Sequence, residues 1–250
     1  MKVIKERASR SGSPRMPKVQ PAEELDTRER LIHVAIRLFA ERGIDGVSTR
    51  DITTAANANS AAIGYHFGSK ENLVRAVFQS LAGPMNRTRL DALAAYERTV
   101  GPDAPLEIEE VARCLIEPAL RAASNPNLDA HYVGRLLALA RTLPASWITQ
   151  VLAEQYDEVF ERFVSAFQRA LPNERYETVC WRYDFLVGSV LHAVSYFDGR
   201  SRIGRVTQGR CDPNDVDSVI QELIQFAGGA MRQDGLQAAP AKKRSARLAR

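Results

Sequence analysis

The sequence has few of the features that mark membrane, secreted or disulfide-bonded proteins. It has no apolar run of about 18 residues, which excludes a transmembrane helix. Its first residues, MKVIKERASRSGSPRMPK, are basic but have no apolar core, so we do not expect a secretory signal. The three cysteines lie far apart, and an odd number argues against a disulfide framework. We therefore expect reduced thiols in a cytoplasmic protein.

Patterns of catalytic and metal-binding residues are also missing. The four histidines are scattered, and none lies at metal-ligand or catalytic-triad spacing from a cysteine or carboxylate. There is no glycine-rich phosphate-binding loop. We therefore expect no enzymatic activity, no catalytic residues, no cofactor and no metal.

Alternating strand patterns are absent, and helical periodicity runs through most of the chain. With 250 residues, 45% of them hydrophobic, the chain is long enough for two domains or one large helical one. Glycine and proline breakers, including Gly83-Pro84, divide it into expected helices. These helices span about 28–42, 48–55, 60–66, 70–81, 85–100, 106–123, 128–142, 145–171, 174–198 and 214–232. The fold class is therefore all-α.

The positive charge is concentrated at the two ends of the chain. Six basic and three acidic residues give 1–25 a net charge of +3, and six against one give 232–250 a net charge of +5. The large middle part, 81–231, is acidic. We expect a disordered basic leader at 1–25 and a disordered basic tail at 233–250. Either segment can be an arm that attracts DNA or a solvated end.

The stretch from Ser48 to Lys70 predicts two short helices joined by a tight turn. Ser48 can cap the first helix, with Asp51 as its capping-box partner. Asn57 tolerates the left-handed backbone of a sharp corner. Helices this short are unstable alone, so they must pack on the amphipathic helix expected at 28–42. The prediction is a three-helix unit with a helix-turn-helix at about 48–67.

The outer face of the second short helix suits a DNA major groove, which admits a helix without bulky side chains. Small or polar residues occupy this face: Asn59, Ser60, Ala61, Gly64 and Tyr65. Tyr65 and His66 close the helix, where they can reach a phosphate or can simply pack. Thr49 and Lys70 lie in the first turns of two helices, whose backbone N–H groups favour an anion. These eight residues are the predicted DNA-binding set.

Three segments carry a resemblance to a known family: GIDGVST at 43–49, Ala55-Ala56, and YHFGSKENL at 65–73. Together they resemble the DNA-binding domain of the TetR family of bacterial transcription regulators, over roughly 27–77. Asn57 stands where the family usually has glycine, and Gly64 where an aromatic residue is common. The resemblance implies a DNA-binding domain at 26–81 and a helical effector-binding and dimerisation domain at 82–232. It also implies operator DNA, a small-molecule effector and a second copy of the chain as partners.

The helices at 174–198 and 214–232 are apolar on more than one face, so each must pack on something besides its own domain. In the TetR family the last two long helices form a four-helix bundle between subunits. The predicted dimer residues are Val187, Val190, Leu191, Val194, Val219, Ile220, Leu223, Phe226 and Ala227. A purely internal core is the alternative.

A ligand pocket is expected among aromatic and amphipathic residues of the middle helices. The candidates are His131, Tyr132, Arg135, Trp147, Tyr156, Phe160, Trp181 and Phe185, although each aromatic can equally be a core residue. A mostly apolar cavity with a few polar groups suits a hydrophobic or aromatic acid or an acyl thioester. The resemblance implies that such a ligand tilts the helix at 70–81 and separates the two recognition helices.

The sequence thus predicts a ligand-responsive DNA-binding regulator, usually a repressor, that binds a palindromic operator as a homodimer. Two alternatives stay open: an architectural DNA-binding protein without an effector, and an all-helical enzyme. The cluster at 48–70, which an enzyme does not require, favours a DNA-binding protein. A sharp sequence preference or release by a small molecule would exclude the architectural alternative.

Overall fold

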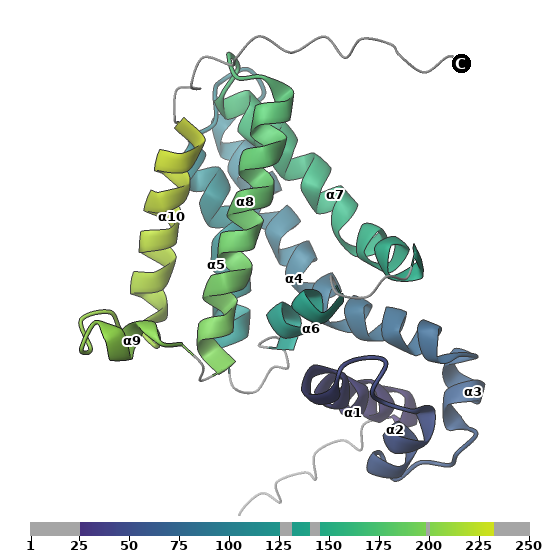
Figure 1. Cartoon of the computed structure of the whole chain (residues 1–250). Coiled ribbons are helices and arrows are strands. Elements are labelled where there is room, and N and C mark those ends of the chain that lie inside the picture. The colour runs from purple at the N-terminus through teal and green to yellow at the C-terminus, as the bar shows by residue number, and fades with distance from the viewer. Residues whose placement is uncertain (1–25, 126–131, 141–145, 199–200, 233–250) are drawn as a thin grey trace, which may run out of the picture.

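The computed structural model describes residues 26–125, 132–140, 146–198 and 201–232, and the regular structure in these ranges is helical (Figure 1). The helices are α1 (Thr27–Arg42), α2 (Thr49–Ala55), α3 (Ala62–Phe67), α4 (Lys70–Val100), α5 (Ile108–Ser124), α6 (Tyr132–Ala140), α7 (Ser146–Ala170), α8 (Tyr176–Val194), a 3₁₀ turn (Ser195–Asp198), α9 (Ile203–Val206) and α10 (Val216–Arg232). The expected leader and tail lie outside the described residues. No helix in the described ranges is both long and apolar enough to cross a membrane.

Local signals fix the short helices at the DNA-binding end. Ser48 and Asp51 form the predicted capping box: the Asp51 N–H donates to Ser48 Oγ at 3.1 Å, and the Ser48 N–H donates to Asp51 Oδ2 at 2.8 Å. Asn57 has a φ of 48°, the left-handed conformation expected of the corner residue. The Asn59 side chain accepts from the Ala61 N–H at 2.8 Å, and α3 begins at Ala62, two residues later than predicted.

Helix α4 contradicts the predicted break at Gly83-Pro84. It is continuous over 31 residues, about 46 Å long, with Pro84 inside it. Proline costs the helix one backbone hydrogen bond, here to the carbonyl of Ser80. Both Ser80 and Pro84 are exposed, so water can satisfy that carbonyl, while buried residues on either side hold the two halves in register. The predicted domain boundary at 81–82 therefore falls within one helix that joins the two ends of the molecule (Figure 1).

Two hydrophobic clusters make up the core. The first contains the buried faces of α1, α2, α3 and the start of α4, together with residues of α6 and of the start of α7. The second contains the end of α4 with α5, α7, α8 and α10. We call them the DNA-side cluster and the body cluster. Because α6 and α7 contribute to the DNA-side cluster, the helix-turn-helix unit packs directly on the larger helical part (Figure 1).

Candidate nucleic-acid interface and ligand cavity

Helix α3 divides into the two faces that the sequence predicts. Ala62, Ile63 and Phe67 are buried in the DNA-side cluster. The opposite face is exposed at Gly64 and Tyr65, and it continues into the exposed turn before α3, which contains Asn59, Ser60 and Ala61. Space around Gly64 is open, and the Tyr65 side chain is 86% exposed. The outer face is therefore free of bulky side chains except at its end, as entry into a major groove requires.

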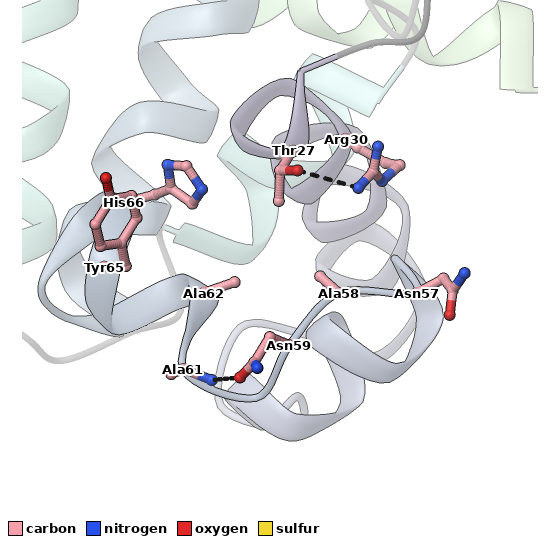
Figure 2. Close-up of a pocket in the computed structure, with 9 residues that line it drawn as sticks. All are labelled: Thr27, Arg30, Asn57, Ala58, Asn59, Ala61, Ala62, Tyr65 and His66. Atoms are coloured by element: carbon pink, nitrogen blue, oxygen red, sulfur yellow. Dashed lines mark hydrogen bonds between the residues drawn. The ribbon is translucent and has the colours of Figure 1, made fainter.

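A shallow hollow of about 470 Å³ lies beside this face, between α3 and the first turn of α1 (Figure 2). Its lining includes Tyr65 and His66, whose rings make an edge-to-face contact at 4.9 Å. Thr27 and Arg30 of α1 complete it, and Arg30 Nε donates to the Ala56 carbonyl at 3.1 Å. Neither residue is in the predicted DNA-binding set. A basic residue in the first turn of a helix that packs on α3 is the sequence feature that could have indicated Arg30. Arg30 adds positive charge beside the predicted groove-reading face.

The two helix N-termini predicted to bind phosphate carry charged side chains of their own. At α2, which begins with Thr49, the Ser48 hydroxyl and N–H hold the pKa of the Asp51 carboxyl below its ordinary value. At α4, Lys70 Nζ donates to the Ile44 carbonyl at 2.6 Å, so this ammonium supports the loop before α2. A phosphate at either end would therefore be bound chiefly by backbone N–H groups, next to a carboxylate at α2.

Replacing Ser48 by alanine should loosen α2, because the Ser48 hydroxyl accepts a hydrogen bond from the Asp51 N–H and donates one to Asp51 Oδ2. Loss of such a cap costs about 1 kcal/mol of stability. We expect a lower midpoint in urea unfolding with an unchanged slope. Thr54→Ala, on an exposed position of the same helix, is the control and should leave the midpoint nearly unchanged. Equal midpoints for the two variants would contradict the role of the cap.

A cavity of about 250 Å³ lies in the body between α4, α5, α7 and α8. Of the predicted ligand residues, Tyr156 and Phe160 line it. Tyr132 and Trp147 instead pack against the DNA-side cluster, and Arg135 is not part of the cavity lining. His131 lies outside the described residues. Arg89 and Tyr183, which the sequence analysis did not select, also line the cavity.

Trp181 and Phe185 do not line this cavity, contrary to prediction. They lie on the outer face of α8, 63% and 65% exposed, with their rings stacked at 6.0 Å. Phe226 of α10, also exposed, lies with them along a groove between α8 and α10. The two helices thus expose an apolar aromatic face.

The predicted dimer residues separate into two groups. Val219, Leu223 and Phe226 of α10 lie along the outer groove between α8 and α10. The predicted α8 residues face the other way and line the internal cavity: Val187, Val190, Leu191 and Val194. Ile220 and Ala227 are buried in the body cluster. The buried residues of this set have almost no exposed surface with which to contact a second copy. The α8 face predicted to form the dimer therefore points inward, and the opposite face of α8 is the exposed one.

The thiol of Cys114, in α5, shows the features of a packed cysteine. Burial and the nearby Glu110 raise its pKa to about 11. Because the thiolate is the reactive form, a thiol that stays protonated reacts slowly with oxidants. This favours packing over redox sensing for Cys114.

A capped helix-turn-helix with an exposed α3 face, joined by α4 to a helical body with an internal cavity, defines a helix-turn-helix protein with a second helical domain. Two family models match the chain: "Bacterial regulatory proteins, tetR family" over residues 31–77, and "Tetracyclin repressor-like, C-terminal domain" over residues 113–230. The chain belongs to the TetR family, which is a family of regulators and not of enzymes.

Individual proteins are similar to parts of this chain. The chain is 43% identical over 58 residues to the probable acrEF/envCD operon repressor of Escherichia coli, covering 23% of this chain and 26% of that protein. It is 29% identical over 117 residues to the transcriptional repressor KstR2 of Mycobacterium tuberculosis, covering 41% of this chain and 56% of that protein. These matches thus span about a quarter to just over half of the relatives' lengths.

A solved structure, the fatty acid degradation regulator FadR from Bacillus halodurans, shares the fold. Its TM-score is 0.57 at 14% identity, covering 84% of this chain and 99% of that one. At this identity the likeness extends to the fold alone.

Proposed function

We propose that this protein is a transcription regulator, and specifically a repressor, that binds operator DNA through α3. The observation that carries the proposal is the outer face of α3: small or polar residues, open space at Gly64, and a fully presented Tyr65 at its end. Arg30 lies beside this face and can contribute to phosphate attraction. Relatives that match parts of the chain carry names that describe them as repressors.

We further propose that the protein acts as a homodimer on a two-fold symmetric operator in the cytoplasm. One α3 face with few basic residues binds weakly, and two half-sites add their binding energies. The exposed rings of Trp181, Phe185 and Phe226 on α8 and α10 supply an apolar face of the kind that dimer contacts bury.

The proposed signal is a small hydrophobic or aromatic effector that binds in the internal cavity and releases the operator. Met85 connects the cavity to both hydrophobic clusters, and it belongs to α4, which continues from the helix-turn-helix. A ligand that favours one position of α4 over another would shift the spacing of the two α3 helices in the dimer.

The experiment that tests this function is a gel-shift titration of the purified full chain on the DNA upstream of its own gene, at fixed salt with excess non-specific competitor. We expect a discrete complex that survives the competitor. If binding to every fragment is equal and is lost to competitor, the repressor proposal fails and an architectural DNA-binding role gains support.

Tyr65→Ala tests the α3 face directly. Because Tyr65 is almost fully exposed, its loss should leave the fold unchanged while removing a contact to DNA. We expect operator affinity to fall by roughly tenfold, the effect of about 1.4 kcal/mol. His33→Ala, an exposed position on α1 outside the lining of the hollow, is the control. Operator affinity equal to that of the unaltered protein would remove Tyr65 from the interface.

A further inference from the structure

The internal cavity contains a buried positive charge. Arg89 of α4 is only 8% exposed, and its side chain lies in the cavity lining among apolar residues such as Leu137, Leu152 and Phe160. Two hydrogen bonds hold the guanidinium: Nε donates to the Leu115 carbonyl of α5 at 2.9 Å, and Nη1 donates to Asn86 Oδ1 at 3.3 Å. The charged group is thus fixed in position at the wall of the cavity.

No carboxylate among the described residues forms an ion pair with Arg89. Asp157 and Asp184 also line the cavity, but both are exposed to solvent, and the two hydrogen bonds of Arg89 go to neutral acceptors. Its Nη2 group makes no hydrogen bond within the described part of the chain. Burial lowers the pKa of Arg89 below its ordinary value, yet a guanidinium remains charged in proteins. An uncompensated buried charge is costly unless a partner arrives.

A second polar group in the cavity also has no partner. The hydroxyl oxygen of Tyr156, on α7, is buried and makes no hydrogen bond to the described residues. Tyr156 and Arg89 line the same cavity; burial raises the pKa of Tyr156 to about 12, and the charge of Arg89 opposes this rise. At neutral pH Tyr156 is therefore a neutral hydroxyl with a proton to donate. An anion at this place would accept hydrogen bonds from both groups.

We propose that the cavity binds a small monocarboxylate with an apolar body, whose carboxylate pairs with Arg89 and accepts a hydrogen bond from Tyr156. This inference rests on the proposed regulatory function and identifies the chemical class of its effector. It favours a free acid over an acyl thioester. The thioester oxygen is neutral and cannot compensate the charge of Arg89 at the wall of the cavity.

The position of Arg89 also connects such a ligand to DNA binding. Arg89 joins α4 to α5 through the Leu115 carbonyl, and its partner Asn86 joins α4 to α7, because Asn86 Nδ2 donates to the Gln155 carbonyl at 2.6 Å. A carboxylate that pairs with the guanidinium competes with the Leu115 carbonyl and with Asn86 Oδ1 for its N–H groups. The effector would thereby alter how α4 packs on the body, and α4 begins beside α3.

The test is isothermal titration calorimetry of the full-length protein, without DNA, with sodium hexanoate, octanoate and 3-phenylpropanoate, each compared with its primary amide. The acids and amides have nearly the same shape and differ in charge. We expect saturable binding of at least one acid and binding of its amide that is weaker by roughly tenfold or more. Absence of binding by all three acids, or equal binding of acid and amide, would overturn the proposal.

Three variants test whether Arg89 and Tyr156 bind the carboxylate of the acid. Arg89→Met, which keeps the length and apolar stem of the side chain, should weaken acid binding by roughly tenfold to a hundredfold, and Tyr156→Phe by roughly twofold to tenfold. Arg162→Met, at a solvent-exposed arginine of α7 paired with Glu97, should leave it unchanged. If Arg89→Met does not fold, Tyr156→Phe still decides, because only one buried oxygen is removed. Acid binding that is insensitive to both cavity variants contradicts the site.

Failure of the site and failure of the regulatory function can be distinguished. If an acid binds through Arg89 but does not change the gel shift on operator DNA, the cavity assignment stands and its effector role falls. If operator DNA is bound and no acid is, the DNA-binding function stands and the carboxylate site falls.

Discussion

Phe226→Glu is expected to convert the dimer into monomers and to lower operator affinity by more than about tenfold. Phe226 is 58% exposed on α10, so its replacement should leave the fold of one chain nearly unchanged. In the proposed dimer the ring becomes buried between α8 and α10 of two copies, where a carboxylate would have no partner. Truncation of such a central aromatic residue costs about 2 kcal/mol or more, and burial of a charge adds to this.

Sedimentation velocity at micromolar concentration, followed by a gel shift of the same sample, checks this prediction. Gln225→Glu introduces the same charge at the neighbouring exposed position, which is not part of the groove, and should remain dimeric. Leu223→Glu tests the same face less sharply, because Leu223 also packs on the body cluster and its replacement affects the fold. The interface is refuted if Phe226→Glu sediments as the unaltered protein does, or if the unaltered protein is a monomer.

Local signals in the sequence were sufficient for the helix-turn-helix. The capping box of Ser48 and Asp51, the left-handed Asn57 and the buried Ile63 of α3 all follow from interactions within a few residues. Such interactions are readable because a cap or a tight turn depends on residue type at fixed spacing. The all-helical fold, and exposure of the predicted α3 face, are confirmed for the same reason; contact with DNA stays a prediction.

The charged residue of the cavity lies in α4 a few residues after the wrongly predicted break. When α4 is read as continuous, its buried stripe passes through Ala82, Asn86, Arg89 and Leu93 at spacings of four and three. A polar and a charged residue on a buried stripe are the signal for a polar site inside an apolar core. The expected helix at 85–100 contains Asn86, Arg89 and Leu93 but not Ala82, so the break shortened the stripe and left Arg89 near the start of a helix. The break was wrong because tertiary packing on both sides outweighs the local cost of one proline.

The faces of α8 were assigned the wrong way round for a different reason. The helix has Trp181 and Phe185 on one side and Val187, Val190 and Val194 on the other, so both sides are apolar. Periodicity identifies an apolar face but does not say which of two such faces packs inward. The neighbours decide this: the valines face residues of α4, α5 and α7 across the cavity, while the described residues leave the aromatic side exposed.

Phe39→Ala should destabilise the DNA-side cluster and separate its unfolding from that of the body cluster. Phe39 is fully buried near the C-terminal end of α1, next to Lys70, whose ammonium lies 6.0 Å from the ring centroid. Removal of a buried phenyl ring costs about 3–5 kcal/mol, a large part of the roughly 5–15 kcal/mol of a whole protein. We expect a first transition that is lower by on the order of 10 °C, with most of the helical signal lost only in a second one.

The two tryptophans can report on the two clusters separately, because Trp147 packs against the DNA-side cluster and Trp181 lies on α8 in the body. In the double variant Phe39→Ala/Trp181→Phe only Trp147 remains, so fluorescence should follow the early transition. In Phe39→Ala/Trp147→Phe only Trp181 remains, so fluorescence should follow the late transition. Leu38→Ala, at the half-buried neighbouring position, should shift the early transition less. Coincident transitions for both tryptophans would mean that the two clusters unfold as one unit. A change at α3 would then reach the cavity through the whole core and not through α4 alone.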